Sequence, residues 1–254
     1  MLQSLRIAAA ARFHAARADL QLIYNLPMNT AHAAAKIDGI GALLGSISIA
    51  RSSVRESSLN GERFAALALL LLASPVIIGA GIVLSLLSRR SPLIAHRRVG
   101  WRGTPLWMLK LRTMWGAGPA AAGTWIESID DDLGPELKCA DDPRVPSRFA
   151  RFCRRHSIDE LPQLWHVITG EMSLVGPRPV TPRELRRYYG TDAPQILSVK
   201  PGLAGLWQIS GRNRLSVAER RRLDLQLVRE GNPALYLSIL LRTAPEVLRG
   251  QNSW

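Results

Sequence analysis

The chain has 254 residues and a mass of 28.0 kDa, which is enough for one large domain or for one domain with an appendage. Apolar residues make up 47% and charged residues 21%, a near-average composition that excludes a wholly disordered chain, a collagen-like repeat and a polytopic membrane protein. Basic residues exceed acidic ones by 33 to 20, so the net charge of +13 predicts an anionic partner: nucleic acid, phospholipid headgroups or a phosphorylated substrate.

The first 62 residues are rich in alanine, serine and arginine, and we assign no chemistry to them. A helix near residues 5–23 is expected, whereas the glycine-rich stretch IDGIGALLGSISIA is too short for a membrane span. An arginine-rich start that is poor in acidic residues also fits an organelle transit peptide. We therefore predict an N-terminal extension over 1–62, a membrane segment over 63–90 and a separate domain over 91–254.

Residues 64–87, FAALALLLLASPVIIGAGIVLSLL, form a run of 24 without a charged side chain. At about 1.5 Å per residue, a straight helix of that length could cross a bilayer core about 30 Å thick. Pro75, preceded by Ser74, removes a backbone donor near the middle, which predicts a sharp kink or a break. Arginines flank both ends, and basic flanks mark the cytoplasmic side of a membrane. The sequence favours a re-entrant helix broken at Ser74 and Pro75, with a kinked spanning helix and a buried core helix as alternatives.

The chain after the apolar run is polar and rich in turn residues. Residues 99–114 predict a turn at Arg102 and Gly103 between two short extended segments. Residues 116–146 are expected to form a solvated loop with an acidic patch at Glu127 and 130–132. Helices are predicted at 162–168, 182–189 and 217–229, the last with a capping box formed by Ser216 and Glu219. The expected fold class is α+β and mainly helical.

Two adjacent carboxylates, Asp159 and Glu160, come just before Leu161 and Pro162. Because proline is favoured at the first helical position, both carboxylates are expected at a helix amino terminus, where the macrodipole favours the ionised form. Carboxylates, cations and a divalent metal are the parts that transfer a phosphoryl group through an aspartyl phosphate. A plain helix cap paired to neighbouring arginines would use the same residues. The arginines just upstream are Arg148, Arg151, Arg154 and Arg155.

The run SIDELPQLWHVITGEMSLVGPRP resembles the signature of bacterial sugar transferases, the monotopic polyprenyl-phosphate phosphoglycosyl transferases. The resemblance extends over residues 64–250 and recurs in order in RVGWRGTPLWMLKLRTM, DPRVPSRFARFCRRHSIDELPQLW and VKPGLAGLWQISGRN. It implies a catalytic domain over 91–254 on the cytoplasmic face of the bacterial inner membrane. The implied reaction transfers a sugar 1-phosphate from a UDP-sugar to undecaprenyl phosphate, with release of UMP, as the first membrane step of exopolysaccharide or O-antigen synthesis. Mg²⁺ is the implied cofactor, and the implied partners are these two substrates and inner-membrane phospholipids, without nucleic acid; a homodimer is one allowed assembly.

The resemblance also implies a role for each motif residue. Asp159 is the expected nucleophile, which becomes a covalent aspartyl-phosphosugar intermediate, and Glu160 is expected to bind the magnesium ion. His166 stands where the family commonly has asparagine and is expected to be structural, and Tyr236 stands where many members have aspartate. The residues expected to bind the substrate phosphates or the nucleotide are Lys110, Arg112, Arg154, Pro177, Arg178, Pro179 and Arg212.

Some residues near these motifs admit a plainer reading. Trp207 is expected to fill a core or lie at the membrane interface rather than to stack on uracil. Gly176 and Gly202 are expected to let the backbone approach a ligand closely. The arginines at 220–222 fit a solvated helix face, although with the net charge they also leave open a membrane-tethered nucleic-acid binder. A catalytically inactive scaffold of polysaccharide assembly is a further alternative, against which the intact Asp159 and Glu160 argue.

Overall fold

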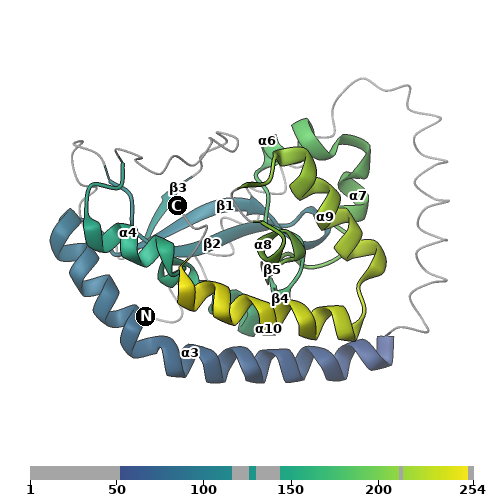
Figure 1. Cartoon of the computed structure of the whole chain (residues 1–254), viewed down its shortest axis with the longest axis horizontal. Helices are drawn as coiled ribbons and strands as arrows, with labels where there is room; N and C mark the ends of the chain where they lie inside the picture. Colours follow the sequence, from purple (N-terminus) through teal and green to yellow (C-terminus); the bar gives the residue numbers. More distant parts are fainter. Residues whose placement is uncertain (1–51, 116–125, 130–143, 212–213, 251–254) are drawn as a thin grey trace, which may run out of the picture. The chain divides into compact units, whose positions relative to one another are not determined.

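The computed structural model describes residues 52–115, 126–129, 144–211 and 214–250 (Figure 1). The chain divides into two units, Met1–Ser58 and Leu59–Trp254, and the contacts that build the core and the site lie within the second. The described part combines many helices with some sheet, in agreement with the predicted α+β, mainly helical class. In chain order the elements are α3 (Ser52–Ser88), β1 (Leu93–Val99), η1 (Trp101–Gly103), β2 (Pro105–Leu111), β3 (Ile126–Ile129), α4 (Arg148–Arg155), η2 (Ile158–Gln163), α5 (Leu164–Thr169), β4 (Ser173–Val175), α6 (Pro182–Glu184), η3 (Leu185–Tyr189), η4 (Gly190–Asp192), α7 (Ala193–Ile196), β5 (Gly202–Ala204), α8 (Leu206–Ile209), α9 (Val217–Glu230) and α10 (Pro233–Arg249).

Helix α3 continues through Ser74 and Pro75 without interruption. Figure 1 shows that it bends along its length, as expected of a helix with an internal proline. The Ser74 hydroxyl donates a hydrogen bond to the Leu71 carbonyl at 2.8 Å, and this is the carbonyl that loses its usual backbone donor at Pro75. Of the two predicted alternatives, the break is wrong and the kink is confirmed: the side chain before the proline satisfies the exposed acceptor, and the chain bends within one helix.

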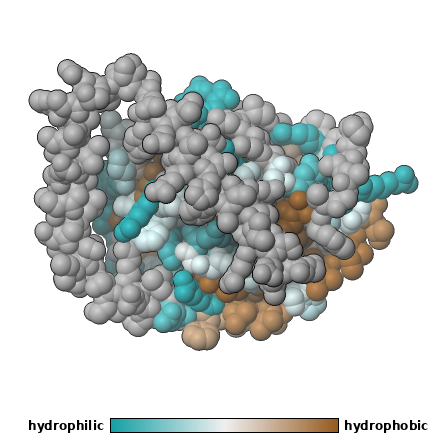
Figure 2. Space-filling view, turned by 180° about the vertical axis from the view of Figure 1, so that it is seen from behind, coloured by the Kyte–Doolittle hydropathy of each residue, from teal (hydrophilic) through white to brown (hydrophobic). Residues whose placement is uncertain are grey.

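The apolar part of α3, Asn60–Ser88, is long and apolar enough to cross a membrane, and it contains an 18-residue stretch with a mean hydropathy of 2.6. One face of it is packed, because Ala66, Ala80 and Leu84 are buried. Other faces are open, and the side chains of Phe64 and Leu72 are 72% and 78% exposed. Figure 2 shows apolar side chains gathered along the edge of the molecule where α3 runs. Such a continuous apolar surface is typical of contact with a membrane or a partner rather than with water.

Strands β1 and β2 form an antiparallel hairpin, with Leu93 opposite Leu111 and Val99 opposite Pro105. The turn between them contains Arg102 in the left-handed conformation, with φ of 56°, so the predicted turn at Arg102 and Gly103 is confirmed.

Strand β3 lies inside the segment predicted as a solvated loop. It pairs in parallel with β1 and covers the edge that β2 leaves open. Glu127 on β3 accepts a hydrogen bond from the buried Arg112 side chain at 2.5 Å. The loop prediction is wrong for 126–129, because pairing with a strand distant in sequence leaves no local signal. The remaining acidic residues of the patch, 130–132, lie outside the described residues.

Strands β4 and β5 pair in parallel through an unusually close backbone contact. A Cβ atom added to Gly176 would lie 2.5 Å from the Lys200 carbonyl oxygen, and one added to Gly202 would lie 2.0 Å from the Gly176 nitrogen. No side chain fits at either position. These glycines therefore allow two backbone segments to meet, which replaces the prediction that they make room for a ligand.

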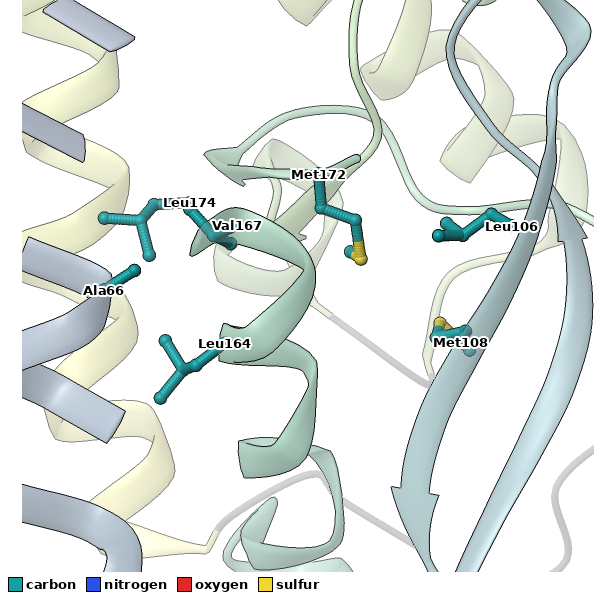
Figure 3. Packing of buried hydrophobic residues seen from close by; sticks show 7 residues of the cluster. All are labelled: Ala66, Leu106, Met108, Leu164, Val167, Met172 and Leu174. Carbon is teal, nitrogen blue, oxygen red and sulfur yellow. The ribbon is translucent and has the colours of Figure 1, made fainter. Parts of the chain in front are cut away.

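The main core joins α3 to the rest of the second unit. Figure 3 shows α5, with Leu164 and Val167, lying between the Ala66 side of α3 and strand β2, which carries Leu106 and Met108. A second cluster packs Leu84 of α3 against β2 and α4. Removal of such residues from water is the main stabilising term in folding. Helix α3 therefore contributes buried side chains to the core of the domain.

The three predicted helical segments are present, two of them with the predicted first residue and one beginning earlier. The segment predicted at 162–168 begins earlier, as the 3-10 helix η2, and continues as α5; the segment at 182–189 is α6 followed by η3. Helix α9 covers the third prediction, and both hydrogen bonds of its Ser216–Glu219 capping box are formed.

Candidate active site

The two carboxylates of the DELPQ segment lie in the first turn of η2. Ser157, just before it, is in the left-handed conformation with φ of 54°, which costs a non-glycine residue about 1–2 kcal/mol. A hydrogen bond from the Glu160 nitrogen to the Ser157 carbonyl, 3.1 Å, closes the turn. The helix therefore begins at Ile158, with Pro162 inside it, and not at Pro162 as predicted. The prediction that Asp159 and Glu160 lie at a helix amino terminus is confirmed, and the strained residue beside them marks a candidate functional site.

Asp159 is buried, with 7% of its surface exposed, next to the thiol of Cys153 on α4. Burial, and then the charge of Asp159, raise the pKa of Cys153 to about 11. The thiol is therefore protonated at neutral pH and is not a nucleophile there.

Glu160 is held by Lys110 from the neighbouring strand β2. The Lys110 Nζ atom lies 2.7 Å from Glu160 Oε1 in a salt bridge, and the two side chains are 21% and 29% exposed. A ligand can reach both groups from solvent. The structure therefore brings together two residues, one on η2 and one on β2, that the motifs place 50 positions apart.

His166 fixes the same strand against α5. It is buried, and its Nε2 atom accepts a hydrogen bond from the Leu109 backbone nitrogen at 3.1 Å while Nδ1 donates to Glu171 Oε2 at 2.7 Å. This pattern requires the neutral ring. The hydrogen bond from His166 lowers the pKa of Glu171 below its usual value. The expectation that His166 is structural is confirmed, and its partner Leu109 is the residue before Lys110.

Arg112, just after β2, is buried and bonded to protein groups. It is 3% exposed, its Nε atom donates to the Ser91 carbonyl at 2.7 Å, and its Nη2 atom donates to Glu127. These contacts join the chain after α3 to β3. Arg112 has a structural role here, and its predicted role in phosphate binding stays a prediction.

The other predicted phosphate ligands lie on separate elements. Arg154 is in the last turn of α4, five residues before Asp159. Pro177, Arg178 and Pro179 follow β4, where the Pro177 carbonyl accepts a hydrogen bond from the Gly202 nitrogen at 2.9 Å. Arg212 lies outside the described residues. The structure thus joins Lys110 to Glu160 through a direct contact and places Arg178 just after β4, at the end of the second sheet.

The carboxylate pair fits one mode of magnesium binding. Among the residues that the structure describes, no group of three or more His, Cys, Asp and Glu side chains could hold a metal by itself. Mg²⁺ in phosphoryl-transfer sites is usually held by one or two carboxylates together with substrate phosphates and water. The partly exposed Glu160 next to Asp159 suits this mode, which requires the substrate for a complete coordination shell.

Glu62, near the beginning of the apolar run, is an important residue that the motifs did not indicate. Its Oε1 atom accepts hydrogen bonds from Ser173 Oγ at 2.6 Å, from the Leu174 nitrogen at 2.7 Å and from the Tyr236 hydroxyl. Burial, and then the hydrogen bond and charge of Glu62, raise the pKa of Tyr236, which therefore stays a donor. Two features of the sequence could have indicated this contact. Glu62 is a carboxylate beside an apolar run, and Tyr236 stands where the resembled family often has aspartate.

Comparison with known proteins gives a consistent result. The family model described as bacterial sugar transferase matches residues 60–250. The chain is 39% identical over 189 residues to the exopolysaccharide production protein ExoY of Rhizobium meliloti. This alignment covers 73% of the chain and 82% of that protein. It is 35% identical over 219 residues to the UDP-galactose-lipid carrier transferase of Erwinia amylovora, covering 81% of the chain and 43% of that protein. It is 36% identical over 173 residues to the undecaprenyl-phosphate galactose phosphotransferase of Salmonella typhimurium, and this alignment covers 64% of the chain and 34% of that protein. The chain therefore spans less than half the length of the latter two relatives.

Proposed function

The chain belongs to the bacterial sugar transferase family, and from this premise we propose that it transfers a sugar 1-phosphate from a UDP-sugar to undecaprenyl phosphate, forming undecaprenyl-diphosphate-sugar and UMP. The observation that carries the proposal is the pair Asp159 and Glu160 in the first turn of η2, with Lys110 2.7 Å from Glu160. The names of the Erwinia and Salmonella relatives support a lipid-carrier acceptor and a galactose-containing substrate for those proteins.

The proposed reaction has two displacements at one phosphorus atom. A carboxylate oxygen of Asp159 attacks the phosphorus that carries the sugar, and the bond from that phosphorus to the bridging oxygen breaks. UMP leaves with the electron pair, and the sugar phosphate is then esterified to Asp159. A phosphate oxygen of undecaprenyl phosphate attacks the same phosphorus, which forms the diphosphate product and regenerates the carboxylate.

The residues around Asp159 supply positioning and charge. Lys110 places a cation at the site, where it can approach the oxygens of a diphosphate, and it orients Glu160. Glu160 would hold Mg²⁺, which when bound neutralises charge on the diphosphate. A protonated thiol is a poor nucleophile, so the raised pKa of Cys153 supports Asp159 rather than Cys153 in this role. Removal of Asp159 from bulk water strengthens its interactions with nearby cations.

The proposal includes a membrane location with both ends of the apolar helix on one side. Near the beginning of the candidate span, Glu62 binds Ser173 and Tyr236 of the domain; near its end, Leu84 packs in the core beside Leu111. A folded domain that contacts both ends of one apolar helix cannot lie on two sides of a membrane. This arrangement supports a helix that enters and leaves by one leaflet. The basic residues that flank the apolar run support the cytoplasmic face for the domain.

The test is release of UMP by the full chain, purified in detergent or nanodiscs, from a panel of UDP-sugars with undecaprenyl phosphate and Mg²⁺. We expect turnover with at least one donor and its loss, by a factor of at least about 10³, in Asp159→Asn. Glu230→Gln, which removes an exposed carboxylate on α9, is the matched control. Undiminished turnover in Asp159→Asn would refute the nucleophile assignment, and absence of turnover with every donor in the wild type would refute the proposed reaction.

A further inference from the structure

A second group of charged side chains lies at the carboxyl edge of the β4–β5 sheet. Parallel strands end at the same edge, and ligands of open parallel sheets commonly bind in the loops that follow them. The loop after β4 carries Arg178, and α8, directly after β5, carries Trp207. Arg220, in the second turn of α9, reaches the same indole ring. Three segments distant in sequence thus converge there.

Two guanidinium groups approach this one ring. The Cζ atom of Arg178 lies 5.9 Å from the Trp207 ring centroid, and that of Arg220 lies 5.3 Å from it. Both distances are within the range of cation–π contact. Two like charges held close together repel each other unless a counter-charge lies between them.

The Arg220 side chain has a donor that protein groups do not satisfy. Within the described residues its Nε atom is buried and has no hydrogen-bond partner. Burial, and then the charge of Arg178, lower the pKa of Arg220, while the nearby Glu184 and Asp224 act in the opposite direction. A buried donor of this kind is satisfied by a ligand or an ordered water.

The nearby carboxylates are engaged in holding the backbone. Glu184 is 3.9 Å from Arg178 Nη1, but its Oε2 atom accepts the Thr181 backbone hydrogen bond of a capping box at 2.7 Å. Asp224 accepts hydrogen bonds from the Tyr189 hydroxyl at 3.0 Å and from the Arg178 backbone nitrogen at 3.3 Å. Both carboxylates are buried, so the outer side of the arginine pair is left for an external anion.

We propose that Arg178 and Arg220 form a two-guanidinium site for a phosphate group, with the Trp207 ring as its platform. The proposal rests on the proposed function and extends it, because Arg220 and Trp207 become substrate-binding residues in addition to Arg178. It also separates Arg220 from the exposed Arg222 of the same helix, although the sequence groups both in one solvated face. The phosphate belongs either to the nucleotide donor or to the lipid acceptor, since both present the same chemical group.

Affinity measurements on the full chain in nanodiscs test the site. UDP is titrated by calorimetry in the presence of Mg²⁺, and KM for undecaprenyl phosphate is measured by UMP release. We expect Arg220→Gln either to raise the Kd for UDP or to raise the KM for undecaprenyl phosphate by about tenfold to a hundredfold. A change of this size is typical for loss of a hydrogen bond between charged groups. Weaker UDP binding assigns the site to the donor, and a raised KM for the lipid assigns it to the acceptor. Arg222→Gln, which removes the same charge from the same helix, should leave both within about twofold.

Two further measurements separate binding from folding and from the reaction. Arg220→Lys keeps the charge but loses the planar fork, so it should fold and bind with intermediate affinity; it replaces Arg220→Gln if the latter has a lower melting temperature. Inorganic phosphate and UDP binding need no turnover, so they test the site even where every donor fails to release UMP. The proposal is wrong if both Arg220 variants retain wild-type affinity for UDP, phosphate and the lipid, or if Arg222→Gln weakens binding as much.

Discussion

The Lys110 Nζ atom lies 2.7 Å from Glu160 Oε1, so the second residue of the candidate catalytic pair is held by a strand that precedes it by 50 positions. This contact makes β2 part of the site. It also predicts that the two residues act as a unit, because each orients the other.

A double-mutant cycle on Lys110 and Glu160 measures this coupling. We expect Lys110→Met and Glu160→Gln each to lower kcat for UMP release by about 10²-fold or more, with the double variant close to the worse single variant. The kcat and KM of all four proteins are the measurement. Losses that multiply in the double variant would show that the two side chains act independently.

His166 offers a test of how β2 is positioned. His166→Ala leaves the partly buried Leu109 backbone nitrogen without its acceptor, which should lower stability by about 1–3 kcal/mol and reduce kcat. His166→Asn supplies an amide oxygen at a similar place and should recover part of both. Melting temperature and UMP release are compared in the three proteins. Equal behaviour of the alanine and asparagine variants would contradict a positioning role for the hydrogen bond.

Asp224 predicts a pH dependence of stability. Burial raises its pKa to about 7 from an ordinary value of 3.8, so the folded protein binds this proton more tightly than the unfolded chain. The associated stability is complete below pH 3.8 and is lost as the pH rises through 7. Between pH 5 and pH 8 the loss is about 3 kcal/mol. The wild type should therefore melt at a lower temperature at pH 8 than at pH 5, and Asp224→Asn should show a much smaller difference. An unchanged pH profile in that variant would assign the dependence to other groups.

Cysteine labelling tests the proposed membrane arrangement. Gly61→Cys adds an exposed thiol at the beginning of the apolar segment, and no atom lies within 4 Å of the new Cβ. In a Cys139→Ser background the buried Cys153 does not react, because its pKa is about 11. We expect a membrane-impermeant maleimide to label Gly61→Cys, and the reference Glu230→Cys in the domain, only after the cells are lysed. Labelling of Gly61→Cys in intact cells would instead favour a spanning helix.

Sequence reasoning succeeded where the signal is local. The turn at Arg102, the capping box of Ser216 and Glu219, and the place of Asp159 in a first helical turn each depend on a few neighbouring residues. Motif order identified the family because several spaced segments recur together.

The failures concern contacts between segments far apart in sequence. Strand β3 exists because it pairs with β1, and Arg112 is buried because Glu127 and the Ser91 carbonyl surround it. The continuity of α3 is a separate, local failure: Ser74 bonds the Leu71 carbonyl three residues before it, a contact that composition does not predict. Arg112 and Lys110 belong to the same motif, and only the structure shows that one is buried and the other partly exposed; the predicted phosphate-binding role of Arg112 stays a prediction.

The packed face of α3 has a practical consequence for studies of this protein. Ala66 and Leu84 are fully buried, and Glu62 holds β4 and α10, so truncation before the polar domain would remove a wall of the core together with the membrane contact. A fragment that starts at β1 would expose Leu106, Leu164 and Leu111 to water and should aggregate. A soluble version is better sought by substituting polar residues for the outward-facing Phe64, Leu72 and Leu86, which leaves every buried contact of the helix in place.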